Sequence, residues 1–292
     1  MLLMQILVNG ILLGGLYACM AIGFSVIWGV MNIINLAHGS MIVLGAYITY
    51  LITTQTGIDP FLTIPASAAG LFLLGYLLQR CLFNFVLHAS IFMTLILTFG
   101  LDMVMININL ALFTADIRSI TPSYSGLSLQ LGGVMLPYTR LGVFILALAL
   151  TFALYLLMNR TRIGQAIRAT AQDPRAARVM GIDTKRIYAT TFGIGACMAG
   201  VAGSLMAVIY AFSPVVGDSF TMKSFVIVVL GGLGSMQGAI VAGIVLGIAE
   251  SIVSGLLAPG YSDAISFIIL VLILVLRPRG IFGKPFIAEA KG

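Results

Sequence analysis

The stretch GQAIRATAQDPRAARVMGID, residues 164–183, holds five charged side chains in twenty residues. These are Arg168, Asp173, Arg175, Arg178 and Asp183. Only 8% of the whole chain is charged, so this stretch interrupts a sequence that is apolar almost everywhere else. The fold is therefore predicted from the apolar segments on either side of it.

The composition of those segments predicts an all-α, polytopic integral membrane protein. The chain has 292 residues, 60% of them hydrophobic, and its mean hydropathy is +1.13. A soluble domain carries about 25% charged residues, so a soluble fold is excluded. Apolar runs of roughly 20 residues suit helices that cross a ~30 Å hydrocarbon core. These runs are continuous rather than alternating, which favours helices over strands.

About eight or nine membrane-spanning helices are expected in one transmembrane domain covering residues 1–292. The nine candidate spans lie near residues 5–30, 38–55, 60–79, 90–113, 139–158, 187–212, 221–237, 238–257 and 262–276. Helix breaks are expected near residues 32–40 and 231–238. Two weakly repeated halves are also expected, since SMIVLGA (residues 40–46) resembles VIVVLGG (residues 226–232).

Basic residues give the expected orientation in the membrane. Seven of the fifteen Lys and Arg residues lie between positions 160 and 186. Four more follow the last candidate span: Arg277, Arg279, Lys284 and Lys291. Cytoplasmic segments are enriched in Lys and Arg, so residues 159–187 and the C-terminus are predicted to be cytoplasmic. With nine spans the N-terminus then lies outside. A topology of eight spans with a different N-terminal arrangement is the alternative.

Residues 114–138 are expected to form an extracytoplasmic loop. Within it, LSLQLGGVMLPY (residues 127–138) alternates around Gly132 and Gly133, which is typical of a β-hairpin. A structured loop of this kind suits a docking surface for a partner, and an inert connector is an equally open interpretation.

The charged stretch has the signals of two short helices. Asp173 followed by Pro174 is the pattern of an N-cap with proline in the first turn, and Gly181 is a stop signal. In the first helix the expected apolar face consists of Ile163, Ala166, Ile167 and Ala171, and the polar face includes Arg168 and Gln172. In the second helix the expected apolar face consists of Ala176, Val179 and Met180, and Arg175 and Arg178 are expected to project away from it. Asp183 is expected to cap the next span. Such short helices are unstable alone in water, so docking on a partner is favoured over a charge cluster that only fixes topology.

The chain lacks a motif of its own for energy supply or catalysis. No GxxxxGK[ST] phosphate loop is present in the sequence. Three cysteines without paired spacing predict neither a disulfide framework nor a metal site. No catalytic residue, metal or cofactor is expected on this chain. Any pumping must draw on an ion gradient or on a separate ATPase.

Polar residues inside the spans are candidates for a translocation pathway, because ionisable groups are costly in lipid. The candidates are Asn35, His38, Ser40, Gly231, Gly232 and Glu250. At the two breaks, amide, hydroxyl and backbone groups would line such a path. The alternative is that Glu250 and a second buried acid, Asp102, hydrogen-bond between helices without meeting substrate, and that His38 is structural.

Three segments resemble the permeases of branched-chain amino acid ABC importers. They are NIINLAHGSMIVLGAY (residues 32–47), TRIGQAIRATAQDPRAARVMGID (residues 161–183) and VLGGLGSMQGAIVAG (residues 229–243). The resemblance is to the smaller, Liv-type permease and holds in order and spacing over nearly the whole chain. It implies a permease domain in the bacterial inner membrane. It also implies a second homologous permease in a heterodimer, two cytoplasmic ABC ATPases that bind the ATP, and a periplasmic or extracellular substrate-binding protein. No nucleic-acid partner is expected.

By the same resemblance, residues 159–187 form a cytoplasmic coupling segment seated in a groove of the ATPase. The residues assigned to this contact are Gly164, Arg168, Gln172, Asp173, Arg175, Ala176, Ala177 and Gly181. The sequence departs from the family after the third span, where QRCLFNFVLHAS (residues 79–90) replaces a basic RP motif.

The leading hypothesis is the translocation subunit of an ATP-driven importer for branched-chain or other hydrophobic amino acids, working by alternating access. Urea, short amides or aromatic acids are alternative substrates within the same superfamily. A cation-coupled secondary amino acid carrier, with coupling sites at Asp102, His38 and Glu250, is the alternative from a different class.

Overall fold

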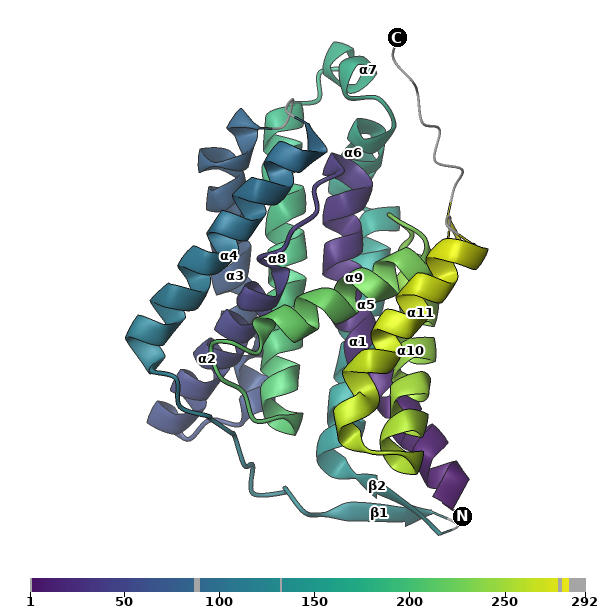
Figure 1. Ribbon diagram of the computed structural model, residues 1–292. Helices are drawn as coiled ribbons and strands as arrows, with labels where there is room; N and C mark the ends of the chain where they lie inside the picture. The colour runs from purple at the N-terminus through teal and green to yellow at the C-terminus, as the bar shows by residue number, and fades with distance from the viewer. Residues whose placement is uncertain (1, 87–89, 132, 278–279, 284–292) are drawn as a thin grey trace.

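The protein is a bundle of α-helices with one small β-hairpin (Figure 1). The computed structural model describes residues 2–86, 90–131, 133–277 and 280–283. The α-helices are α1 Leu2–Met31, α2 His38–Thr56, α3 Ile64–Cys81, α4 Ile91–Phe113, α5 Tyr138–Arg160, α6 Arg162–Gln172, α7 Pro174–Val179, α8 Thr184–Ile209, α9 Gly217–Gly231, α10 Met236–Leu256 and α11 Ser262–Leu276. Three short 3-10 helices lie at Pro60–Thr63, Phe83–Phe85 and Pro259–Tyr261, and the strands are β1 Ser128–Leu131 and β2 Val134–Pro137.

The two ends of the bundle carry different structures. Most long helices run between the ends, with the β-hairpin and the start of α1 at one end and α6 and α7 at the other (Figure 1). We call these the hairpin end and the α7 end. Helix α11 begins toward the hairpin end and rises toward the α7 end, so Arg277 follows it on the side of the charged stretch. The further basic residues at 279, 284 and 291 lie outside the described residues, as does His88 in the stretch that departs from the family.

Each of the nine predicted spans coincides with a helix, but the helices differ in length. Six are long and apolar enough to cross a membrane: α1, α3 with its preceding 3-10 turn, α4, α5, α8 and α10. Helices α9 and α11 have 15 residues each, about 22 Å of helix against a hydrocarbon core of about 30 Å. Helix α9 lies obliquely across the middle of the bundle in Figure 1.

Both predicted helix breaks are confirmed. Residues 32–37 leave the helical pattern after α1 and return into the bundle, where α2 starts at mid-height (Figure 1). Residues 232–235 separate α9 from α10. The two segments whose similarity suggested repeated halves, residues 40–46 and 226–232, lie on α2 and at the end of α9. Each of these helices is followed by another apolar helix. The repeat itself stays a prediction.

Glycine allows the closest helix contacts. Gly10 and Gly14 on α1 face Gly243 and Gly247 on α10, with Ala18 continuing the same four-residue spacing. A Cβ atom on Gly14 would lie 2.6 Å from the Cα of Ile244, and one on Gly243 would lie 2.6 Å from the backbone nitrogen of Ala18. Small residues at this spacing let helices approach within lipid, where apolar side chains alone give little drive for association.

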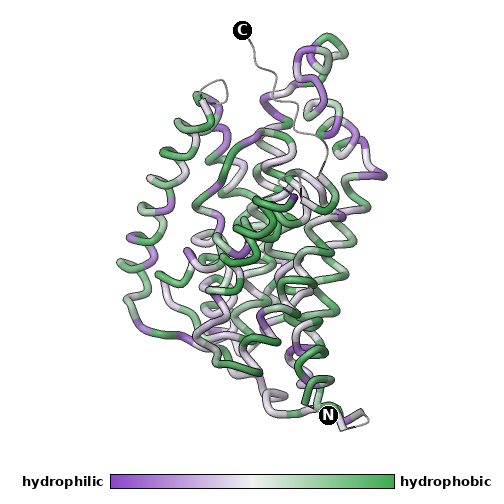
Figure 2. Tube along the Cα trace, turned by 45° about the vertical axis from the view of Figure 1, so that its right-hand side comes forward, coloured by the Kyte–Doolittle hydropathy of each residue, from purple (hydrophilic) through white to green (hydrophobic). Residues whose placement is uncertain are grey.

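The exterior of the bundle is apolar. In α1 and α8, 89% of the most hydrophobic window is buried, whereas in α3, α4 and α5 only 28% is buried although these helices are similarly hydrophobic. Large side chains such as Phe92, Phe99 and Phe152 are therefore exposed. Figure 2 shows hydrophobic colour along the outer helices, while the α7 end carries much of the hydrophilic colour. This distribution suits a protein surrounded by hydrocarbon.

The predicted hairpin is confirmed and is attached to α1. Strands β1 and β2 pair antiparallel, with Leu131 opposite Val134 in the register. The Gln5 side chain donates to the carbonyl of Met135 and accepts from its amide, both at 2.8 Å. The hairpin is therefore fixed over the start of α1.

Candidate functional site

The charged stretch folds as two capped helices at the α7 end. The Thr161 hydroxyl accepts the Gly164 amide at 3.1 Å and caps α6. The Asp173 carboxylate accepts the amides of Arg175 and Ala176 at 2.7 and 3.1 Å and caps α7. These two hydrogen bonds hold the pKa of Asp173 below its ordinary value.

The predicted stop and the predicted third cap are also confirmed. Gly181 adopts φ +82°, the left-handed conformation that ends a helix with least strain in glycine. Asp183 caps α8 by accepting the amides of Lys185 and Arg186. The local sequence signals therefore place all three helix boundaries.

Helix α6 is anchored to the end of α5, and its buried face differs from the predicted one. The buried residues are Gly164, Ile167 and Thr170, whereas Ile163 is 50% exposed and Ala171 is exposed. A Cβ on Gly164 would overlap the carbonyl of Met158. The prediction of the apolar face was wrong at two of four positions, because the tight contact at Gly164 sets which side of the helix is buried.

Two arginines of the stretch also have structural partners. Arg168, predicted on the polar face, is half-buried and donates to the Met158 carbonyl and to Asn159 Oδ1. Such contacts to the carbonyls at a helix C-terminus stabilise the helix end. Arg178, predicted to project away, donates from Nε to the Thr184 hydroxyl at 2.9 Å. Both side chains therefore hold α6 and α7 to the ends of the long helices.

The outer surface of α7 is exposed and apolar. Ala177 is buried against the bundle, whereas Gln172, Arg175 and Ala176 are exposed. The side chains of Val179 and Met180, at the end of α7, are 86% and 81% exposed. The predicted coupling residues thus divide into those that fix the segment and those that are accessible to a partner.

Polar residues at the first break are buried within the bundle. Asn35, His38 and Ser40 have no exposed surface. His38 Nε2 donates to the Met20 carbonyl at 2.9 Å, and the Ser40 hydroxyl donates to Asp102 Oδ1 at 2.5 Å. Within the described residues, Asn35 Oδ1 and His38 Nδ1 have no hydrogen-bond partner.

The glycines at the second break make close backbone contacts. Gly231 at the end of α9 touches Gly238 near the start of α10, and Gly232 adopts φ +101° beside Gly283. The amides of Ile281 and Phe282 donate to the carbonyls of Leu230 and Gly231. The segment after α11 therefore satisfies the last carbonyls of α9.

Glu250 is the centre of a buried polar cluster that joins four helices. The carboxylate accepts from the Tyr17 hydroxyl on α1 at 2.5 Å, from Lys223 Nζ on α9 at 3.0 Å and from the Ser266 hydroxyl on α11 at 2.5 Å. Lys223 Nζ also lies 3.1 Å from Asp263 Oδ1. The side chains of Lys223 and Glu250 are 12% and 3% exposed, whereas that of Asp263 is 58% exposed.

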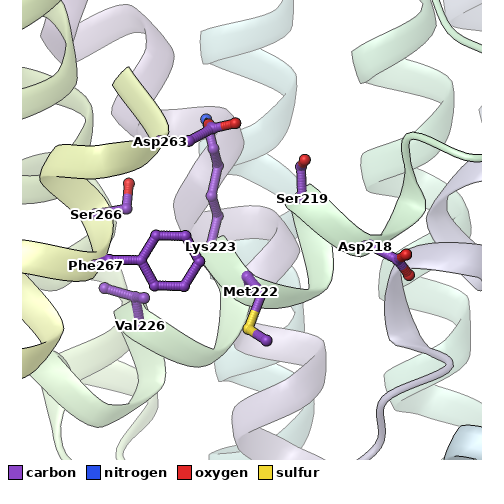
Figure 3. Close-up of a pocket in the computed structure, with 8 residues that line it drawn as sticks. All are labelled: Asp218, Ser219, Met222, Lys223, Val226, Asp263, Ser266 and Phe267. Atoms are coloured by element: carbon purple, nitrogen blue, oxygen red, sulfur yellow. The ribbon is translucent and has the colours of Figure 1, made fainter. Parts of the chain in front are cut away.

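Lys223 and Asp263 line two neighbouring cavities. The smaller, of about 200 Å³, lies between α9 and α11, and Figure 3 shows Lys223 extended from α9 toward Asp263 beside it. The larger, of about 520 Å³, is lined by residues of α1, α5, α8, α9, α10 and α11. We call it the charged cavity. Among the predicted pathway residues, Glu250 alone lines either of these two cavities.

Sequence reasoning missed two hydrogen-bond partners of Glu250 and two further charged residues that line the charged cavity. Tyr17, Arg140, Asp263 and Ser266 were not singled out, although Arg140 and Asp263 carry a detectable signal as charges beside apolar helices. Tyr17 and Ser266 carry none, because hydroxyl groups are common in buried helices. In residues that the structure describes, no three His, Cys, Asp or Glu side chains are placed to share a metal ion.

An apolar exterior, glycine-packed helices, two helix breaks and a charged cavity between helices define a multi-pass helical membrane protein of the transport class. Residues 6–274 match the family model described as the branched-chain amino acid transport system permease component. The chain belongs to this family.

Curated relatives agree over almost the whole chain. The permease BraD of a Pseudomonas aeruginosa high-affinity branched-chain amino acid transport system is 32% identical, covering 97% of this chain and 96% of its own length. The permease LivH of Escherichia coli K12 is 33% identical with the same coverage. LivM, another permease protein of such a system in that organism, is 28% identical over 91% of this chain and 67% of its own length. No solved structure matches the chain significantly.

Proposed function

We propose that this permease is the translocation subunit of an ATP-driven importer for branched-chain amino acids. The observation that carries the proposal is the exposed surface of α7, a rigid capped helix whose Val179 and Met180 side chains lack a partner in the described residues. Exposed apolar side chains on a charged, water-facing segment are typical of a protein–protein contact. The relatives named above are permeases of branched-chain amino acid transport systems.

The geometry of the segment suits the transfer of motion from an ATPase. Helix α6 is anchored to α5 through Gly164 and Arg168, and α8 begins at the Asp183 cap. A displacement of α7 would therefore act on two long helices rather than be absorbed by a loop. Alternating access would follow from the closure of two ATPase subunits that bind the ATP.

The remaining partners and the orientation follow from the same proposal. A second permease, related as LivM is, would complete the pathway, and a binding protein would deliver substrate at the hairpin end. The α7 end and the C-terminus would face the cytoplasm of a bacterial inner membrane. Asn35, His38, Ser40, Gly231 and Gly232 would meet substrate in a conformation that opens the two breaks.

The coupling contact can be tested by Arg175→Glu combined with Ala176→Trp. Both side chains are exposed, so we expect normal insertion and folding but no ATP-dependent leucine uptake and no co-purification with the ATPase subunits. Arg162→Glu, at an exposed position at the start of α6, is the matched control. Normal uptake by the double variant would contradict the proposed contact. Uptake that survives ATP depletion but collapses with an ionophore would indicate a cation-coupled carrier instead.

A further inference from the structure

The charged cavity carries charges of both signs, together with an apolar wall. Its lining includes the cations Arg140 and Lys223 and the anions Glu250 and Asp263. We propose that it binds a free zwitterionic α-amino acid with an aliphatic side chain, between arrival at the hairpin end and entry into the bundle. This inference rests on the proposed function, because it assigns a site on this chain to the transported solute.

Arg140 is the group that would hold the α-carboxylate. It lies in the first turn of α5, is half-buried, and lines the cavity. The ion pairs found in residues 2–86, 90–131, 133–277 and 280–283 do not include Arg140. Guanidinium binds carboxylate through two parallel hydrogen bonds, which gives both affinity and orientation. An arginine kept beside a cavity without an internal counter-ion is therefore suited to an anionic group of a ligand.

The ammonium group would lie against Asp263, because both oxygens of Glu250 already accept hydrogen bonds within the buried cluster. Lys223 Nζ contacts one oxygen of each carboxylate, Glu250 Oε2 and Asp263 Oδ1. The side chain of Asp263 is 58% exposed, so part of it stays accessible to a second cation. In Figure 3, Asp263 and Lys223 are adjacent on facing helices α11 and α9. Asp263 is therefore the carboxylate that can accept the ligand ammonium, while Glu250 holds Lys223 in place.

The charges of the cavity balance, and so do those of the ligand. Two cations and two anions sum to zero, and a zwitterion leaves that sum unchanged. A net charge would be costly to bring into a cavity surrounded by apolar helices. The aliphatic side chain would pack on Leu12, Leu13, Ile209 and Phe220, which line the same cavity.

This chemistry separates the alternative substrates. Urea and short amides carry no carboxylate for Arg140, and aromatic acids without an amino group carry no cation for Asp263. The cavity therefore favours amino acids over the other solutes considered for this superfamily.

Binding can be measured with L-leucine on the purified transporter complex without its binding protein. We expect saturable binding whose affinity falls tenfold or more in Arg140→Gln. A decrease of that size corresponds to the loss of about one charge-assisted hydrogen bond. Leucinol lacks the carboxylate and 4-methylpentanoate lacks the ammonium. Each should bind to the wild type as weakly as L-leucine binds to the Arg140→Gln variant. Arg118→Gln is the matched control, since Arg118 belongs to an ion pair with Asp116 outside the cavity. Equal affinity in wild type and Arg140→Gln would overturn the site.

A second measurement does not depend on removing a charge. Ser254 lines the cavity, so Ser254→Cys, in a background without Cys81 and Cys197, should react with a thiol reagent and be protected by leucine but not by urea. Lack of protection in a complex that imports leucine would overturn the site and leave the proposed function intact. Absence of ATP-driven leucine uptake by the wild type would contradict the proposed function instead.

Discussion

The α6–α7 segment and the Glu250 cluster both concentrate charge, yet their charged groups have opposite surroundings. Arg175 in α7 is exposed, and the carboxylate of the N-cap residue Asp173 accepts, within the described part of the chain, only from backbone amides. In the cluster, Lys223 and Glu250 are nearly buried and bind each other across two helices. An exposed charge has water as an alternative partner, whereas a buried charge has only its neighbour. The first region is therefore suited to an external contact and the second to holding the bundle and shaping its cavity.

Removing Lys223 should give the largest effect on stability. Lys223→Ala leaves Glu250 buried without its counter-ion, and breaking a buried pair costs about 3–5 kcal/mol. The measurement is the free energy of unfolding of the purified protein in detergent. Arg175→Ala is the exposed control and should change it by less than about 0.5 kcal/mol. Equal stability of the two variants would mean that Glu250 does not need its ion pair with Lys223.

Changing the apolar surface of α7 should separate function from stability. Val179→Ser with Met180→Ser should alter the free energy of unfolding by less than about 0.5 kcal/mol, because both side chains are already exposed. ATP-driven uptake should nevertheless fall, since the proposed apolar contact with an ATPase would be lost. Thermal unfolding and uptake, measured on the same preparation, test whether uptake falls while stability is unchanged. Unchanged uptake would show that these side chains do not contact a partner.

The smallest expected effect is a local dependence on pH at α7. Hydrogen bonds from two amides lower the pKa of Asp173, so its cap is fully present above the unfolded pKa of about 3.9. That contribution is lost as the pH falls through the lower pKa of the folded segment. Hydrogen exchange at the amides of Arg175 and Ala176, corrected for intrinsic rates, should show this loss.

Asp173→Asn is the control for that measurement. Asparagine caps a helix about as well as aspartate but does not ionise, so the variant should keep α7 capped without the acid-dependent step. A wild type that shows no step, or a variant that keeps it, would contradict the assignment to Asp173.

The structure of the α6–α7 segment was predicted well where the signal was local. Asp173, Gly181 and Asp183 act on backbone groups within a few residues, so capping rules place their helix boundaries from sequence. The buried face of α6 was predicted less well. The contact between Gly164 and the end of α5 depends on how two helices cross, and helical periodicity alone does not contain that information.

The same contrast holds inside the bundle. The sequence identified Glu250 as a costly buried charge, but Tyr17 is 233 residues away in the chain and Lys223 is 27. Nothing in the local pattern around Tyr17 distinguishes it from other hydroxyl groups in apolar helices. Only the packing of α1, α9, α10 and α11 makes these side chains neighbours.

The sequence by itself determined the class of protein, the places where helices break and the capped form of the charged stretch. Each of these follows from hydrophobicity summed over a segment or from hydrogen bonds within one turn. The tertiary structure decided which charges pair, which arginine lines a cavity outside the ion pairs of the described residues, and which side of α7 is exposed. Those features depend on distances between segments far apart in the chain, and pairing or burial then changes the free energy of each charge.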